Sequence, residues 1–194
     1  LYTKGNMYQC CNGNVLYHGC IPLDSNGQFE KINCGDRVLY GRDYLDYCQT
    51  KIREAYTIRD QDHLDFMWYM WTGPLSPLSG RKMKLFERLL VNDRSTWNEP
   101  RNPYYEHYYN EKTCEMILRE FSLDPKTGHI INGHTPIMAK DGETPVRAGG
   151  KLLVIDGGFC KAYQDKTGIA GYTLIYSSHY LHLKAHTPFT TIED

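Results

Sequence analysis

The chain has 194 residues, 41% of them hydrophobic, which is enough for one sizeable core. Its 22 lysines and arginines are balanced by 23 aspartates and glutamates, so the charge excludes partners that need a one-sign surface, such as nucleic acid or an anionic membrane. No apolar run approaches the roughly 20 residues that cross a bilayer, and no charged-then-apolar leader is visible. Seven cysteines without a Cys-x-x-Cys pair indicate reduced thiols rather than a disulfide framework or a zinc knuckle. We therefore expect one domain, residues 1–194, in a cytoplasmic protein.

The first predicted element is a β-hairpin. Met7–Cys11 and Asn14–His18 flank Asn12-Gly13, a dipeptide that readily adopts positive φ and makes a two-residue hairpin turn. The chain starts at Leu1 without an initiator methionine and enters this strand pattern within a few residues. We therefore expect that it begins inside a longer polypeptide.

The middle of the chain is predicted to be helical. Apolar residues recur at three- and four-residue steps over Tyr40–Tyr56, Leu64–Trp71 and Cys114–Phe121, as one buried helical face requires. Most of the tyrosines and tryptophans share this spacing, so they are assigned to the core rather than to base stacking. Pro74–Pro103 holds four prolines and is expected to be irregular, with one short helix around the apolar residues Phe86, Leu89 and Leu90.

After Pro125 the pattern changes to short β-rich runs. They cover residues 130–131, 151–155, 172–176 and 180–185. The run Leu152–Ile155 is apolar throughout, as a strand covered on both faces requires. The order strands, helices, strands predicts an α+β fold, with a β-hairpin region at 1–38, a mainly helical region at 39–125 and a mainly β region at 126–194.

Two of the eight histidines are candidate metal ligands. His18 ends a strand and is followed by Gly19-Cys20-Ile21-Pro22, and His134 follows Ile130–Asn132 and Gly133 before a turn. Each ring is thus expected at the end of a strand, where sites are commonly built, although a hydrogen-bonded loop histidine gives the same pattern. Structural roles are expected for His63, His107 and His179. His182 and His186 lie too far apart along one strand to share an ion.

Longer stretches carry a family resemblance. They are Asn14–Pro22, Trp68–Gly73, Phe86–Arg88, Asn102–Tyr105, Gly128–Pro136, Gly150–Phe159 and Thr167–Leu174. In this order they resemble the class III fructose-1,6-bisphosphatases of bacteria, along essentially the whole chain. That family is similar to the calcineurin-like metallophosphoesterases, so the resemblance implies the C-terminal part of a β-sandwich flanked by helices.

The resemblance also implies a chemistry. The complete enzyme would hydrolyse fructose 1,6-bisphosphate to fructose 6-phosphate and phosphate, a gluconeogenic step, with two metal ions that bind the phosphate and activate a hydroxide. His18 would correspond to the isolated metal histidine of the superfamily, and His134 to the histidine of its Gly-His motif. Neutral imidazoles suit Mn²⁺ there, with iron or zinc as alternatives.

The departures from the superfamily pattern indicate an incomplete site. Its Asp-x-His, Gly-Asp-x-x-Asp and Gly-Asn-His-Glu or Gly-Asn-His-Asp motifs do not occur, since Gly35-Asp36 has Leu39 where the second aspartate falls. Pro136 occupies the last position of Gly-His-x-His, as in the branch that resembles serine/threonine protein phosphatases. No catalytic residue is therefore assigned in this segment, and the chain by itself is expected to bind metal weakly and to turn over nothing.

For the substrate's second phosphate the candidate ligands are Arg88, Arg147 and Lys161, cations near turns or glycine-rich loops, with solvated surface charges as the alternative interpretation. Asp156-Gly157-Gly158 is expected to shape the floor of the cleft, unless Asp156 merely caps a turn.

Three functions remain open from the sequence. The first is the bisphosphatase segment, with a sugar bisphosphate and the missing N-terminal part of the polypeptide as partners. The second is a phosphatase of the same superfamily with another phosphoester substrate. The third is a non-catalytic fragment that associates with its missing part or with itself as a homo-oligomer, which an exposed apolar patch would support.

Overall fold

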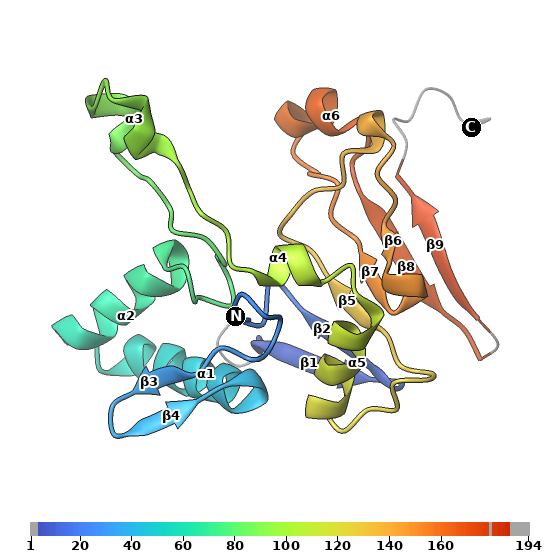
Figure 1. Cartoon of the computed structure of the whole chain (residues 1–194), viewed down its shortest axis with the longest axis horizontal. Coiled ribbons are helices and arrows are strands. Elements are labelled where there is room, and N and C mark those ends of the chain that lie inside the picture. Colours follow the sequence, from blue (N-terminus) through green and yellow to red (C-terminus); the bar gives the residue numbers. More distant parts are fainter. Residues whose placement is uncertain (1–3, 179, 187–194) are drawn as a thin grey trace.

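The computed structural model describes residues 4–178 and 180–186, and their fold is α+β, as predicted. A helical part and a sheet part lie side by side, and a thin arm rises from the helical part (Figure 1). The strands are β1 Tyr8–Cys11, β2 Asn14–Tyr17, β3 Ile32–Cys34, β4 Arg37–Leu39, β5 Ile130–Asn132, β6 Val146–Arg147, β7 Leu152–Val154, β8 Tyr172–Tyr176 and β9 Leu181–Ala185. The α-helices are α1 Gly41–Thr57, α2 Gln61–Thr72, α3 Glu87–Leu90, α4 Tyr104–His107, α5 Glu111–Glu120 and α6 Lys161–Thr167.

The main sheet has the strand order β1-β2-β5-β7-β6. Its three central strands are parallel, and β1 and β6 pair antiparallel at the two edges. The predicted hairpin is confirmed, because β1 and β2 are joined by Asn12 and Gly13, whose φ angles of 51° and 78° are the positive values that such a two-residue turn needs. A mixed sheet of this kind brings the ends of β2, β5 and β7 to the same edge.

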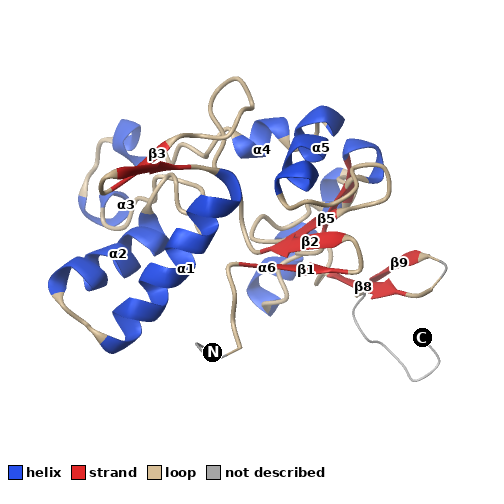
Figure 2. Cartoon of the chain, turned by 90° about the horizontal axis from the view of Figure 1, so that it is seen from below, coloured by secondary structure: helices blue, strands red, loops and turns tan. Residues whose placement is uncertain are grey.

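The core lies between this sheet and the helices α4 and α5, which cover one of its faces (Figure 2). α5 buries Cys114, Ile117 and Leu118 completely, as its predicted apolar face requires. The strand β7 is buried at all three of its residues, which confirms that it is covered on both faces. The buried side chains that meet here include Val15, Ile117, Leu118, Ile130, Leu152 and Val154.

The helical part is built from α1 and α2, both predicted. α2 begins at Asp60, whose carboxylate accepts a hydrogen bond from the backbone N–H of His63, and it ends before Gly73. Contact with α1 is made by Phe66, whose ring lies 6.0 Å from that of Tyr47, and by Met70, which is 1% exposed.

The core assignment of the aromatic residues is only partly correct. Leu64, Trp68 and Trp71 are 49%, 51% and 54% exposed, because they share the face of α2 that turns away from α1. Core positions are instead occupied by five of the tyrosines: Tyr17, Tyr44, Tyr104, Tyr105 and Tyr108. The apolar spacing identified the helix correctly but did not reveal that this face of α2 is uncovered.

The segment between Pro74 and Pro103 forms the arm (Figure 1). Its two sides meet at an antiparallel bridge between Arg81 and Arg101, and its tip carries α3 as predicted, followed by a short 3₁₀ turn. Phe86, Leu89 and Leu90 at the tip are 63%, 79% and 78% exposed. This apolar cluster is therefore mostly uncovered by the described part of the chain.

Several short elements were not predicted: the hairpin β3–β4, the helices α4 and α6, and the two-residue strand β6. The hairpin β3–β4 has Gly35 and Asp36 at its turn, so this Gly-Asp pair serves a tight connection, with Gly35 at φ 68°. α6 has only seven residues and ends at Gly168, which adopts the left-handed conformation at φ 80°. Elements this short carry too few apolar repeats to be recognised by periodicity.

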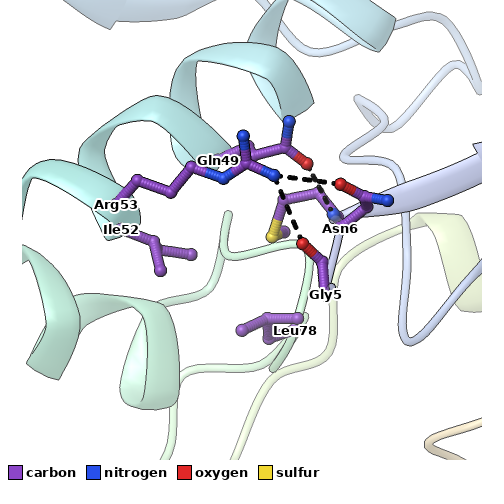
Figure 3. A pocket seen from close by; sticks show the side chains of 7 residues that line it. Gly5, Asn6, Gln49, Ile52, Arg53 and Leu78 are labelled. Carbon is purple, nitrogen blue, oxygen red and sulfur yellow. Dashed lines mark hydrogen bonds between the residues drawn. The ribbon is translucent and has the colours of Figure 1, made fainter. Parts of the chain in front are cut away.

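The start of the described chain is fastened to α1 (Figure 3). The backbone N–H of Met7 donates to Gln49 Oε1 at 3.0 Å, and Arg53 Nη2 donates to Asn6 Oδ1 at 3.1 Å. The residues that make these bonds line a small hollow together with Ile52 and Leu78. They join the hairpin that carries His18 to the helical part.

Candidate metal centre

His18 and His134 come together because β2 and β5 are neighbouring parallel strands. The register pairs Val15 with Ile130 and Leu16 with Ile131, so both strands reach the sheet edge at the same level. The ladder continues beyond the strands, since Gly133 N donates to His18 O at 3.0 Å. The two histidines, 116 positions apart in the sequence, therefore leave adjacent strand ends.

The two rings are in direct contact. Nε2 of His18 lies 3.0 Å from Nδ1 of His134, and the ring centroids are 4.9 Å apart with the planes at 69°. Two nitrogens that bind one cation at right angles, at about 2.1 Å each, are separated by about 3.0 Å. The observed distance is thus compatible with a shared octahedral ion as well as with a hydrogen bond between the imidazoles.

Both imidazoles are held neutral. Burial, followed by the charges of His18 and Arg81, lowers the pKa of His134 to about 4. Partial burial also lowers the pKa of His18, and the carboxylate of Asp156 offsets this in part. At neutral pH the rings therefore have lone pairs available, which is the protonation state that a metal ligand needs.

The backbone at His134 is strained. Its φ is 63°, in the left-handed region, and Thr135 N donates to Gly133 O at 2.7 Å across it, so the chain makes a γ-turn. A non-glycine residue in this conformation costs of order 1–3 kcal/mol and persists only where its surroundings impose it. The turn directs the imidazole towards His18.

Asn132 holds the two strand ends in place. Its side-chain nitrogen donates to Gly19 O at 3.1 Å and to the hydroxyl of Tyr104 at 2.8 Å, and that hydroxyl lies 2.8 Å from the hydroxyl of Tyr17. Asn132 is 2% exposed, so this network is shielded from solvent. The network therefore joins Gly19, which follows His18, to Asn132, which lies two residues before His134.

Two polar atoms around this site have no partner in the described part of the chain. Oδ1 of Asn132 and Nε of Arg81 are buried and make no hydrogen bond to any described residue. Buried polar atoms are nearly always satisfied in folded proteins, so such a cluster marks a place that accepts a further group. The donor set fits a cation only in part, since no group of three or more histidine, cysteine or acidic side chains positioned to hold a metal occurs among the described residues.

The residues predicted to shape the cleft lie beside the pair. Asp156 Oδ1 accepts a hydrogen bond from Gly158 N at 2.8 Å, so it caps this turn, while its charge reaches both imidazoles. Gly157 is needed for close packing, because a Cβ there would lie 2.7 Å from the backbone of Gly171. Asp156 therefore caps the turn and also lies close enough to the two imidazoles for its charge to affect their pKa values.

The three candidate phosphate ligands are scattered. Arg88 lies on α3 at the tip of the arm and contacts Glu99, with their charged atoms 4.0 Å apart, so the structure does not bring it to the histidines. Arg147 is buried against the rings of Tyr108 and Tyr109, which follow α4 in the chain. Lys161 begins α6, and its side chain lies outside what the structure describes. Their roles in substrate binding stay predictions.

Arg81 was missed by the sequence reasoning. It lies at the base of the arm, and its charge contributes to the low pKa of His134. The sequence around it, Ser79-Gly80-Arg81, follows a proline-rich stretch and carries no recognisable spacing to either histidine. The fold alone brings it to the site.

Comparison with known proteins identifies the family. The whole chain, residues 1–194, matches the family described as Firmicute fructose-1,6-bisphosphatase. It is 50% identical over 198 aligned residues to the class 3 fructose-1,6-bisphosphatase of Clostridium botulinum strain 657, and 49% identical over 195 to that of Clostridium tetani. These alignments cover 99% and 97% of this chain and 30% of each relative. No solved structure matches the chain.

The chain is therefore part of a phosphoric monoester hydrolase lineage. It belongs to the Firmicute, or class 3, fructose-1,6-bisphosphatase family, and it spans about 30% of the length of the curated relatives that it matches. No helix among residues 4–178 and 180–186 is long and apolar enough to cross a membrane.

Proposed function

We propose that this chain supplies one part of the active site of a fructose-1,6-bisphosphatase, and that the polypeptide at the length of its relatives hydrolyses fructose 1,6-bisphosphate to fructose 6-phosphate and phosphate. The observation that carries the proposal is the contact between His18 and His134, whose nearest ring nitrogens are 3.0 Å apart, in a chain that matches the family over its whole length. We further propose a gluconeogenic role in the cytoplasm and a calcineurin-like metallophosphoesterase fold for the complete domain.

In this proposal His18 and His134 hold one divalent cation, with Mn²⁺ preferred and iron or zinc as alternatives. A bound metal pair would supply an activated hydroxide and neutralise charge on the phosphate. The chain itself contributes two neutral imidazoles, each with a lone pair, the strained turn that orients His134 and the network that fixes Asn132. Arg81 is suited to bind a phosphate oxygen beside the cation, because its Nε is buried without a partner.

The remaining metal ligands and the acid for the leaving group are proposed to come from outside this chain, so the chain alone is expected to be inactive. His18 lines an open hollow of about 430 Å³ together with Asn132 and Gly133, which leaves room for such residues and for substrate. Two imidazoles by themselves form a weak and incomplete coordination shell.

The experiment uses a polypeptide extended to the length of the clostridial relatives. With Mn²⁺ it should release phosphate from fructose 1,6-bisphosphate, and His18→Ala or His134→Ala should lower kcat/KM by about 10²-fold or more and reduce bound manganese. His182→Ala on the exposed strand β9 is the matched control and should leave both unchanged. Full activity of His134→Ala, or of the 194-residue chain alone, would contradict the proposed site. A panel of other sugar phosphates separates this function from another phosphatase specificity.

Association with the rest of the polypeptide, or with a second copy, is a second candidate function of the same chain. It is favoured by the exposed apolar side chains on α2 and at the tip of the arm, namely Leu64, Trp68, Trp71, Phe86, Leu89 and Leu90. Copurification of the separately expressed parts, weakened by Leu89→Ser and Leu90→Ser together, tests it.

A further inference from the structure

A second pocket is lined in part by Thr135 and Pro136, in the turn that carries His134. It is a hollow of about 380 Å³ between α4, the loop that follows His134, and α6. The side chains that line it carry three positive charges and one negative charge, from Arg101, Arg147, Lys166 and Glu143. The pocket is thus cationic in a chain whose total charge is close to neutral.

Arg147 forms the floor of this pocket and is 5% exposed. Its guanidinium lies over the rings of Tyr108 and Tyr109, 4.7 and 4.6 Å from their centroids, and Nη1 donates to both hydroxyls. Among the described residues its carboxylate partner is Glu143, 3.4 Å from Nη2, whose side chain is 39% exposed. Stacking fixes the orientation of the guanidinium without neutralising its charge.

The charge of Arg147 is therefore only partly compensated. Its Nε is buried and makes no hydrogen bond to a described residue. A buried guanidinium with an unsatisfied N–H is costly unless another acceptor completes it. Lys166 and Arg101 are exposed and line the same pocket, so an acceptor that enters from solvent reaches a pocket lined by three cations.

The position of the pocket links it to the candidate metal centre. Thr135 and Pro136 line it, and they follow His134 directly in the chain. Tyr105, on the same wall, contacts Arg101 with the guanidinium 5.9 Å from the ring centroid. The residues directly after His134 are thus part of the wall of this pocket.

We propose that this pocket binds a phosphate group, and that it holds the phosphate of the sugar bisphosphate that is not hydrolysed. The assignment of that phosphate to the sugar bisphosphate rests on the function proposed above. A phosphate dianion matches the two uncompensated positive charges, and its oxygens accept hydrogen bonds from guanidinium and ammonium groups. A neutral or cationic ligand would leave the charge of Arg147 only partly compensated.

The first test uses the 194-residue chain itself and inorganic phosphate, with EDTA present so that no metal site takes part. Titration followed calorimetrically should detect binding, and the Arg101→Gln/Lys166→Gln double variant should weaken it about tenfold or more. Both residues are exposed, so folding should be preserved, whereas replacing Arg147 would remove a buried group. Lys112→Gln on α5 is the control and should bind as wild type does. No binding by the wild-type chain, or equal binding by the double variant, overturns the pocket.

The second test uses the polypeptide of full family length with Mn²⁺. The Arg101→Gln/Lys166→Gln variant should lose about tenfold or more in kcat/KM for fructose 1,6-bisphosphate, but nothing for an aryl monophosphate, which has no second phosphate. An equal loss for both substrates, or no loss for either, overturns the role in substrate binding. If the wild-type polypeptide hydrolyses neither substrate, the proposed function fails, and the metal-free titration still decides whether the pocket binds phosphate.

Discussion

The buried network beneath the histidines gives a sharp prediction for Tyr104→Phe. The hydroxyl of Tyr104 accepts from Asn132 Nδ2 and shares a hydrogen bond with the hydroxyl of Tyr17, both at 2.8 Å. Tyr104 is 0% exposed and Tyr17 is 6% exposed. The substitution removes one oxygen atom and leaves two buried polar groups without that partner.

The cost follows from those two groups. A buried donor or acceptor that loses its partner costs about 1–3 kcal/mol, and Asn132 keeps its second bond to Gly19 O. We therefore expect Tyr104→Phe to lower the free energy of unfolding by about 2–4 kcal/mol, a large part of the total for a domain. Urea unfolding followed by circular dichroism measures it.

Two controls make the prediction refutable. Tyr180→Phe, at a side chain that is 66% exposed, should change the free energy of unfolding by less than about 0.5 kcal/mol. The double variant Tyr17→Phe/Tyr104→Phe should lose less than the sum of the single variants, since no tyrosine hydroxyl remains unpaired there. A loss below about 0.5 kcal/mol for Tyr104→Phe would refute the reasoning, because the network would then contribute nothing.

Gly19→Ala should destabilise the chain by about 1–3 kcal/mol in urea unfolding, because the new Cβ would lie 2.5 Å from the backbone oxygen of Pro77, whereas Gly133→Ala, whose nearest neighbour would be 3.5 Å away, should be nearly neutral. Equal stability of the two variants would contradict this packing. His63→Gln should lower the melting temperature at about pH 5.5 and leave it unchanged at about pH 8.5. The hydrogen bond to Asp60 raises the pKa of His63, so its stabilisation is complete below the unfolded-state pKa of about 6.5 and is lost as pH rises through the folded-state pKa. A difference between the proteins that does not depend on pH would exclude this assignment.

Local structure was predictable wherever the signal was itself local. The turn at Asn12-Gly13 depends on the positive φ that these two residues tolerate, and α5 depends on apolar residues spaced within ten positions. α6 was not predicted because it is short and carries little apolar periodicity. The exposure of Trp68 and Trp71 was not predicted, because the spacing of apolar residues reveals that a helix has an apolar face but not whether another element covers that face.

The sequence by itself determined the family, the α+β class and the two histidines at strand ends, because these depend on residue identity and on patterns a few positions long. Only the tertiary structure decided that β2 and β5 are neighbours in parallel register, which brings His18 and His134 into contact. It alone brought Arg81 to the imidazoles and buried Arg147 against tyrosines. Strand order and long-range burial result from how the whole chain packs, and no short window of residues contains that information.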